Sequence, residues 1–480
     1  MDYNRYFSDD VPSFMRSPVR EIFRKVDLSA IFSFAGGYPD AATFPTEDIK
    51  RLSALVLEKY GAKALQYGAT QGVTELREVI AKRYSVPVEN VQITTSSQQG
   101  IDVCTRILCN PGDTILTTAP TYLGALQSFR SYRANVVTLP DVCGGAVSAG
   151  RDTLGESKES EIFAESQKFP TSFDPTAEAV PRQAGEISPY CPPGDILPFR
   201  ARRGRQAPEG VSSGSATPPD VQCCQGTQEW AGRQQNQPFL TPGHPRVGGP
   251  AAKFCYVIPD FQNPSGVTMT LQERERLVAM AREGDSIIVE DSPYRELRYS
   301  GTPVPTIYSL APERTLHLGS FSKIFAPGFR LGWIIGPQPL LEQIFVCKQA
   351  LDLCPPVFDQ YMAAEFMGSG ALDANLQKSI ELYRTKRDLM LSLLEKYMPE
   401  GVSWTHPEGG LFLFLTLPEH IDTVALYDRA LAAGVAYVAG SFFYPDGSHR
   451  NTMRLNFSYL DSSRMEPGLR LLAEIVRDIT

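Results

Sequence analysis

The sequence predicts an α/β fold: a doubly wound domain with a mostly parallel sheet sandwiched by helices, followed by a smaller α+β region. Two observations carry this prediction. Short β-branched runs, apolar on both faces as in buried parallel strands, alternate with amphipathic stretches of helical length. Beyond about residue 346 the helical stretches lengthen, with one at 373–397, and a further strand follows at 410–417.

The first predicted elements follow one another as strand, helix, strand and helix. A strand at 91–94 precedes a helix at 96–108, and residues 110–113 (Asn-Pro-Gly-Asp) indicate a turn. A second strand at 114–118 leads to a helix that begins at Tyr122. This alternation is the one expected for a doubly wound sheet.

The same alternation resumes after residue 250. A strand at 254–258 is followed by a turn at 263–266 (Asn-Pro-Ser-Gly). Thr270 and Glu273 have the spacing of a capping box and predict a helix at 271–282. Further strands are expected at 286–289, 315–318 and 331–335.

Residues 141–250 differ in composition from the rest of the chain. They contain 14 Gly and 14 Pro but only 17 Val, Ile, Leu and Phe, with no sustained period, which is typical of low-complexity segments. One interpretation is a disordered surface insertion, since loop-closure entropy grows slowly with length. The other is a non-native segment created by a frameshift or mis-joining. The patternless Arg, Pro, Gly and Gln content favours the second interpretation.

Charge and composition exclude several classes of protein. The chain of 480 residues carries 46 Lys and Arg against 54 Asp and Glu, which argues against a nucleic-acid partner. No stretch approaches the roughly 20 apolar residues of a membrane span, so no membrane partner is expected, and residues 1–10 lack the features of a secretory signal. Nine scattered cysteines, an odd number, indicate a reducing, cytoplasmic compartment. Cys223, Cys224 and His244 fit no zinc spacing, so no metal site is expected.

Polar side chains follow four of the predicted strands, where ligands bind in α/β sheets. They are Ser97 with Gln98, Asn263, Asp291 and Lys323. Lys323 is preceded by the hydroxyl groups of Ser320 and Ser322 and followed by Arg330. This combination can hold a phosphorylated carbonyl cofactor, because a lysine forms an imine while hydroxyls and an arginine bind the phosphate.

Asp291 strengthens this interpretation. A carboxylate at the end of a buried strand needs a partner, and a pyridinium nitrogen is such a partner, because the carboxylate keeps the nitrogen protonated and the ring electron-withdrawing. Tyr294 and Asn263 could both hydrogen-bond a phenolic oxygen on that ring. The helix start at Ser97 and Gln98 suits a phosphate. Taken singly, each residue also has an ordinary explanation, such as a helix cap, a packed tyrosine or an Asn-Pro turn.

These residues belong to a series of motifs that follow the order of one known family. The motifs are FAGGYP (34–39) with FP (44–45), ALQYG (64–68), TTSSQQG (94–100), APTY (119–122), PDFQNPSG (259–266), EDSPYREL (290–297), SFSKIFAPGFR (320–330), PEGG (407–410) and MRLNFS (453–458). On these motifs, which span nearly the whole chain except 141–250, the sequence resembles the class I/II, fold-type I aminotransferases that depend on pyridoxal 5′-phosphate (PLP). It is most similar to their 2-aminoadipate, kynurenine and aromatic aminotransferase branch.

The resemblance implies a role for each cofactor-site candidate. Lys323 is implied as the catalytic residue, which holds PLP as a Schiff base and moves a proton between the substrate Cα and the cofactor. Asp291 is implied to pair with the pyridine nitrogen, Asn263 and Tyr294 to contact the phenolic oxygen, and Tyr122 to stack on the ring. The phosphate is expected to meet Ser97, Gln98, Ser320, Ser322 and Arg330.

The resemblance also implies how substrates bind. Arg454 would hold the α-carboxylate by a bidentate fork that a lysine cannot reproduce, with Asn263 beside it. Gly37 would allow close approach of the backbone to the substrate. Residues 16–20 resemble a mobile N-terminal arm, in which Arg20 would meet a distal carboxylate, as in 2-oxoglutarate or 2-aminoadipate.

The expected activity is transfer of an amino group from an L-amino acid (2-aminoadipate, aromatic or branched-chain) to a 2-oxo acid such as 2-oxoglutarate. Tyr67 is implied to reach the phosphate bound by a partner subunit, so a homodimer with shared active sites is expected. The expected domains are an N-terminal arm with part of a small domain at 1–45, a large PLP-binding domain at 46–345 and a small domain at 346–480.

Other functions stay open on the sequence alone. A PLP-dependent carbon–sulfur lyase, or a related elimination or cyclopropane-forming enzyme, would use the same residues. A transcription factor with an aminotransferase-like sensor domain is disfavoured, because the motifs begin within the first 40 residues and the chain is acidic. An inactive paralogue would result if residues 141–250 had replaced native elements between a strand near 136–139 and the strand at 254–258.

Overall fold

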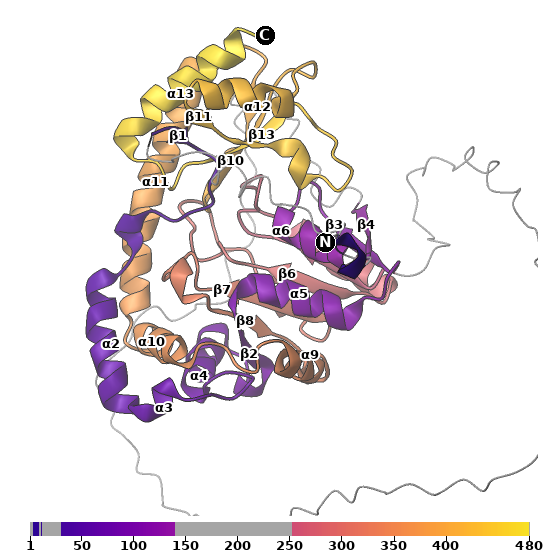
Figure 1. Ribbon diagram of the computed structural model, residues 1–480, viewed down its shortest axis with the longest axis vertical. Coiled ribbons are helices and arrows are strands. Elements are labelled where there is room, and N and C mark those ends of the chain that lie inside the picture. Colours follow the sequence, from indigo (N-terminus) through magenta and orange to yellow (C-terminus); the bar gives the residue numbers. More distant parts are fainter. Residues whose placement is uncertain (1–2, 9–10, 12–29, 140–251, 480) are drawn as a thin grey trace, which may run out of the picture. The chain divides into compact units, whose positions relative to one another are not determined.

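The computed structural model describes residues 3–8, 11, 30–139 and 252–479 (Figure 1). Arg20 and residues 141–250 lie outside the described residues, so the expectations for both stay predictions. Within the described ranges, no helix is long and apolar enough to cross a membrane.

The described residues form three sheets, of which the largest has seven strands. Its strands are β2 (Val91–Thr94), β3 (Thr114–Thr117), β4 (Asn135–Thr138), β5 (Phe254–Val257), β6 (Ile287–Asp291), β7 (Thr315–Ser320) and β8 (Gly332–Ile335). Their order across the sheet is β2-β8-β7-β6-β5-β3-β4. Strand β8 is antiparallel to both neighbours, and every other neighbouring pair is parallel. The predicted α/β class with a mostly parallel sheet is confirmed.

Helices cover both faces of this sheet. Successive side chains of a strand point to opposite faces, and all four residues of β5 are buried. Phe254 and Tyr256 pack in one apolar cluster with Ile101 of α5 (Ser96–Leu108), whereas Cys255 packs in a second cluster with Leu277 of α7 (Leu271–Glu283). Burial on two faces explains why the strands are apolar throughout rather than alternating.

The helices begin close to the predicted positions. The predicted capping box is present at α7, where the Thr270 hydroxyl accepts from the Glu273 N–H and the Glu273 carboxylate accepts from the Thr270 N–H. The remaining helices near the large sheet are α2 (Thr46–Tyr60), α3 (Ala62–Leu65), α4 (Thr74–Tyr84), α6 (Leu123–Ser131), α8 (Ile307–Leu310), α9 (Gln338–Leu351) and α10 (Val357–Gly368). Short 3-10 helices are η1 (Asn4–Tyr6), η3 (Ala41–Thr43), η4 (Val88–Asn90), η5 (Pro327–Phe329) and η6 (Gly440–Phe443).

The C-terminal part forms the predicted smaller α+β region. Its antiparallel sheet has β10 (Phe412–Thr416) and β13 (Thr452–Asn456) at the centre, flanked by β9 (Ser403–Trp404) and β12 (Val438–Ala439). The first described strand, β1 (Phe32–Ser33), pairs in parallel with β11 (Val435–Ala436), so the chain near Phe32 joins this region. The accompanying helices are α11 (Ala371–Tyr397), α12 (Thr423–Ala432) and α13 (Ser462–Arg477).

Strand ends differ from the prediction where polar residues continue the backbone pairing. Strand β6 extends to Asp291, and β7 extends to Ser320, whereas the apolar runs that predicted these strands end earlier. Strand β8 begins at Gly332 and is antiparallel, a direction that an apolar run does not encode. Asp291 therefore sits in the sheet itself and not in the loop that follows.

Candidate active site

The carboxyl ends of the parallel strands meet at one edge of the large sheet, where ligands bind in this class of fold. Asp291 is the last residue of β6, and Lys323 follows the end of β7. Because β8 is antiparallel, its first residue, Gly332, pairs with Ser320 at the end of β7. Arg330, just before β8, therefore lies at the same edge as Lys323 and Asp291.

The Lys323 amino group is partly buried at this edge. Its Nζ donates a 2.6 Å hydrogen bond to the Gly37 carbonyl oxygen, 286 positions earlier in the chain. Burial, followed by the positive charges of Arg454 and Arg330, lowers the pKa of Lys323 to about 8. A lysine in this state reaches its neutral, nucleophilic form more readily than an exposed lysine.

The Asp291 carboxylate is buried and only half satisfied. Its Oδ2 accepts a 2.7 Å hydrogen bond from the Tyr256 hydroxyl, while Oδ1 has no hydrogen-bond partner within the described residues. Burial raises the pKa of Asp291 to about 7, and the Tyr256 hydrogen bond opposes that rise. An unpaired buried acceptor is costly, so Oδ1 suits a ligand that brings a donor.

Tyr256 was not singled out from the sequence. A tyrosine in a fully buried strand is one available signal, since its hydroxyl needs a partner there. The partner could not be identified from the sequence, because it depends on the register between β5 and β6, which pairs Tyr256 with Val289.

Tyr294 and Asn263 lie on two different loops beside these groups. Tyr294 is buried and makes an edge-on contact with the Phe412 ring, with ring centroids 5.8 Å apart. Burial raises the pKa of Tyr294 above its ordinary value, and the side chain of Asn263 acts in the opposite direction. Asn263 is buried too, and its Oδ1 accepts a hydrogen bond from Arg454.

Tyr122 and Gln98 come together over Gly124. The Gln98 amide nitrogen donates a 3.1 Å hydrogen bond to the Gly124 carbonyl oxygen. A Cβ atom on Gly124 would lie 2.5 Å from Cζ of Tyr122 and 2.6 Å from Oε1 of Gln98. The missing side chain at position 124 therefore lets both residues pack at the start of α6.

The start of α5 gathers an arginine and hydroxyl groups. Nη2 of Arg330 donates a 2.7 Å hydrogen bond to Oγ of Ser96, which was not among the predicted residues. Ser96 is buried and has a positive φ of 72°. Ser97 follows in the first helical turn, whose N–H groups have no partner inside the helix and carry the positive end of its dipole. Across the edge, the backbone N–H of Ser322 donates to Oγ of Ser320 at 3.2 Å.

Arg454 lies at the centre of β13 and is buried. Its Nη1 donates to Oδ1 of Asn263 at 2.8 Å and its Nη2 to the Ala35 carbonyl at 2.6 Å, while Nε has no partner within the described residues. The guanidinium carbon lies 4.3 Å from the centroid of the Phe412 ring and 5.1 Å from that of Phe443. Burial lowers the pKa of Arg454 to about 10. No carboxylate of the described residues neutralises it, so an anionic ligand suits this position.

The remaining predicted residues are Gly37, Tyr67 and Arg20, and of the two that the structure describes, only Gly37 forms a hydrogen bond to the groups described above. The Gly37 carbonyl accepts from Lys323, and a Cβ atom on Gly37 would lie 3.1 Å from the Phe412 ring. The side chain of Tyr67 is 78% exposed and forms no hydrogen bond to the other predicted residues among those described. Arg20 lies outside the described residues.

The α/β fold and the groups at its sheet edge define an enzyme that can hold a phosphorylated carbonyl cofactor and an anionic substrate. Comparison with known families agrees with this class of protein. The family described as aminotransferase class I and II matches residues 35–180 and 252–472, which leaves 181–251 between the matched ranges. The chain belongs to this family and is a PLP-dependent aminotransferase.

Individual relatives narrow the position within the family. The chain is 37% identical to aromatic-amino-acid aminotransferase 1 of Thermococcus litoralis, covering 100% of this chain and 95% of the relative. It is 28% identical to the 2-aminoadipate transaminase of Thermus thermophilus, covering 100% and 98%. The solved structure of a Pyrococcus horikoshii kynurenine aminotransferase matches with a TM-score of 0.75 at 34% identity, covering 100% and 98%. The chain falls in this aromatic, 2-aminoadipate and kynurenine aminotransferase branch.

Proposed function

We propose that this aminotransferase moves the amino group of an aromatic L-amino acid, 2-aminoadipate or a branched-chain amino acid to a 2-oxo acid such as 2-oxoglutarate. The observation that carries the proposal is Arg454, a buried cation that contacts the rings of Phe412 and Phe443. The α-carboxylate shared by all these substrates supplies the missing anion. The nearby rings suit apolar and aromatic side chains, and the names of the relatives support the same donors.

The residues at the sheet edge fit PLP. The unpartnered Oδ1 of Asp291 is the observation that tests this, because a protonated ring nitrogen would supply the donor that the carboxylate lacks. Asn263 and Tyr294 would face the phenolic oxygen, and Tyr122 would cover the ring. The proposed phosphate contacts are Ser96, Ser97, Gln98, Ser320, Ser322 and Arg330.

PLP supplies an electron-withdrawing ring that accepts the electron pair released at the substrate Cα. Asp291 would keep the ring nitrogen protonated, since the attraction between carboxylate and pyridinium favours the charged pair. Arg454 would orient the substrate through its α-carboxylate, and the two flanking rings would exclude water from the salt bridge.

Lys323 would carry the proton. With its pKa lowered to about 8, Nζ would be able to accept the proton of the substrate Cα near neutral pH and to donate it again. The hydrogen bond from Nζ to the Gly37 carbonyl holds the amine beside Gly37, which is proposed to face the substrate. Both features suit a general base that works in two directions.

A homodimer completes the proposed site. Tyr67 and Leu65 are 78% and 71% exposed, and Tyr67 would reach the phosphate of the partner subunit. The proposed domains are the arm at 1–45, the PLP-binding domain at 46–345 and the small domain at 346–480. Arg20 would meet the distal carboxylate of a dicarboxylic substrate. The five described cysteines are all free, which supports a cytoplasmic location.

The test is an absorbance spectrum of the purified protein, followed by a panel of amino donors with 2-oxoglutarate. We expect a yellow protein whose absorbance falls on addition of phenylalanine, tyrosine or 2-aminoadipate alone, and glutamate formation when 2-oxoglutarate is present. Pyruvate and ammonia released from a sulfur amino acid without any acceptor, in place of glutamate, would overturn the proposal in favour of a carbon–sulfur lyase.

A lysine pair provides the matched control. Lys323→Ala should lose the absorbance and the transfer activity, because a missing proton carrier alone costs about 10²–10⁴-fold. Lys378→Ala changes an exposed lysine of α11 and should leave both unchanged. Full turnover by the Lys323→Ala variant would contradict the role given to this residue.

A further inference from the structure

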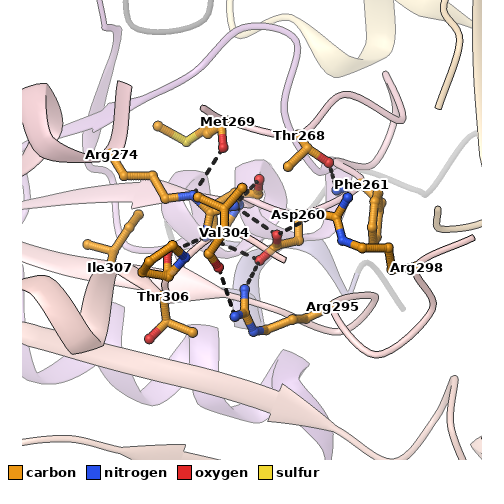
Figure 2. A network of polar contacts seen from close by, with 12 residues as sticks. Asp260, Phe261, Thr268, Met269, Arg274, Arg295, Arg298, Val304, Thr306 and Ile307 are labelled. Atoms are coloured by element: carbon orange, nitrogen blue, oxygen red, sulfur yellow. Dashed lines mark hydrogen bonds and ion pairs between the residues drawn. The ribbon is translucent and has the colours of Figure 1, made fainter. Parts of the chain in front are cut away.

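The buried carboxylate of Asp260, which has no role in the site described above, lies close to three arginines (Figure 2). Asp260 is 1% exposed, and its Oδ1 accepts a 2.8 Å hydrogen bond from Nη2 of Arg274. Its Oδ2 accepts from Nη1 of Arg295 at 2.9 Å, and Nη2 of Arg298 lies 3.8 Å from Oδ1. Burying charged groups costs desolvation free energy, so this cluster calls for an explanation beyond stability alone.

Arg274 ties together the two ends of the loop that carries Asn263. Fully buried at the start of α7, it donates to the carbonyl oxygens of Met269 at 3.1 Å and Pro259 at 3.0 Å. It also donates to the Pro305 carbonyl at 2.8 Å. The loop from 259 to 269 is thereby closed around one guanidinium.

The other two arginines come from the segment that carries Tyr294. Arg295 is the next residue along the chain, and its second nitrogen donates to the Val304 carbonyl at 2.8 Å. Arg298 lies over the Phe261 ring, 4.7 Å from its centroid, and donates to Glu408 at 2.6 Å. The cluster therefore connects the segment after β6 to the loop after β5.

Phe261 shows why this connection reaches the cofactor contacts. Its φ of 51° is positive, which is uncommon for a bulky residue and turns the chain sharply just before Asn263. A Cβ atom on Gly409 would lie 2.4 Å from Cζ of the Phe261 ring, and a Cβ atom on Gly410 would lie 2.6 Å from Cβ of Phe261. Arg298 covers the same ring. Ring packing on both sides holds Phe261 in this conformation.

We propose that Asp260 is a positioning residue, which acts through its three arginines to hold Asn263 and Tyr294 at a fixed separation. The inference rests on the proposed roles of Asn263 and Tyr294 toward the phenolic oxygen of PLP. Without the carboxylate, the guanidinium groups of Arg295 and Arg274 would face each other unscreened in a buried site and repel. The two loops would separate, and the two donors would no longer converge.

The test uses the full-length holoenzyme with Asp260→Asn. The absorbance of bound PLP changes with pH as the imine with Lys323 loses its proton. Donors to the phenolic oxygen favour its anionic form, so their loss should raise the pH midpoint of this change by about half a unit to one unit. PLP affinity, measured by dialysis, should fall about tenfold, equivalent to one mispositioned hydrogen bond. Thermal melting of each variant separates these effects from a general loss of stability.

Arg298 offers a second variant, which leaves the Asp260 carboxylate and its hydrogen bonds to Arg274 and Arg295 in place. Arg298→Gln should raise the midpoint in the same direction, and Arg298→Lys should give an intermediate value, because lysine keeps the charge near Glu408 but not the planar contact with Phe261. Arg282→Gln removes an exposed arginine that pairs with Glu313 and should leave the midpoint unchanged. Where Asp260→Asn does not yield folded protein, the Arg298 variants decide the matter.

Two direct variants separate the possible failures. If Asn263→Ala and Tyr294→Phe leave the midpoint unmoved, the proposed cofactor contacts are wrong. If they raise it while Asp260→Asn and Arg298→Gln only lower the melting temperature, the cluster stabilises the fold without positioning the donors, and the inference is overturned.

Discussion

Nη1 of Arg454 donates a 2.8 Å hydrogen bond to Oδ1 of Asn263, which lies 191 positions earlier in the chain. The bond joins β13 of the smaller sheet to the loop after β5 of the large sheet. An amide carries its acceptor and its donors on different atoms, so this bond occupies the oxygen and leaves the nitrogen for another acceptor. The residue proposed to hold the substrate thus orients a residue proposed to hold the cofactor.

Replacement of Arg454 should change the pKa of Lys323. Arg454 and Arg330 both lower this pKa, after burial, to about 8. In Arg454→Met one of the two cations is gone, so the pKa should rise, by about one unit for a partly buried pair of charges. The apoprotein captures PLP through the neutral amine, so its capture rate should rise with pH around a midpoint near 8 in the wild type. The midpoint should lie higher in the variant.

Stopped-flow absorbance at a series of pH values measures this midpoint. Arg454→Lys keeps a cation at the position and should keep the midpoint close to that of the wild type. Identical midpoints for the methionine variant and the wild type would show that the two residues are not coupled.

Asp291 should make the stability of the apoprotein depend on pH. Its pKa in the folded protein is raised from 3.8 to about 7 by burial, so the native state binds the proton more tightly than the unfolded chain. Its stabilising contribution is therefore complete below pH 3.8 and is lost as the pH rises through 7. At 1.36 kcal/mol per pKa unit, the loss is at most about 4 kcal/mol.

Urea unfolding of the apoprotein at pH 5 and pH 8 tests this expectation. The wild type should lose stability between the two values, and Asp291→Asn, whose amide does not titrate there, should lose less. Saturating PLP should reduce the loss in the wild type, because a ring nitrogen gives the carboxylate a partner. The same loss in both apoproteins would assign the pH dependence to other groups.

Arg454→Lys should mainly impair substrates that carry an α-carboxylate. Lysine offers a point charge and cannot form two parallel hydrogen bonds, so we expect about a 10²-fold fall in kcat/KM for an amino acid donor. Reaction with phenethylamine, an aromatic amine without the carboxylate, should be nearly unaffected. Equal losses for both donors would mean that the substitution disturbs the cofactor site instead.

The sequence was sufficient for the seven strands of the large sheet, in their order along the chain, and for the polar residues that follow four of them, because both follow from local patterns. It was not sufficient for contacts that depend on register or on distant segments. The bond from Tyr256 to Asp291 depends on how β5 pairs with β6. The contact of Ser96 with Arg330 joins residues 234 positions apart, across an antiparallel strand whose direction the apolar pattern does not encode. The Asp260 cluster is similarly non-local.

Gly332 should be essential for the geometry of the proposed phosphate site. A Cβ atom on it would lie 2.7 Å from the Gly319 carbonyl oxygen and 2.8 Å from backbone atoms of Ser96 and Ser97. These are backbone atoms and cannot rotate away, so Gly332→Ala must shift the start of α5 or separate β8 from β7. We expect a loss of about 1–3 kcal/mol in unfolding free energy and weaker PLP binding, since Ser96 and Ser97 would move.

Gly328→Ala is the matched control. It lies in the same segment, and a Cβ atom there would have no atom within 4 Å. Equilibrium dialysis against PLP and thermal melting should therefore separate the two alanine variants, with Gly328→Ala close to the wild type in both measurements. If Gly332→Ala bound PLP as tightly as the wild type, the start of α5 could move without consequence, and the phosphate would have to be held elsewhere.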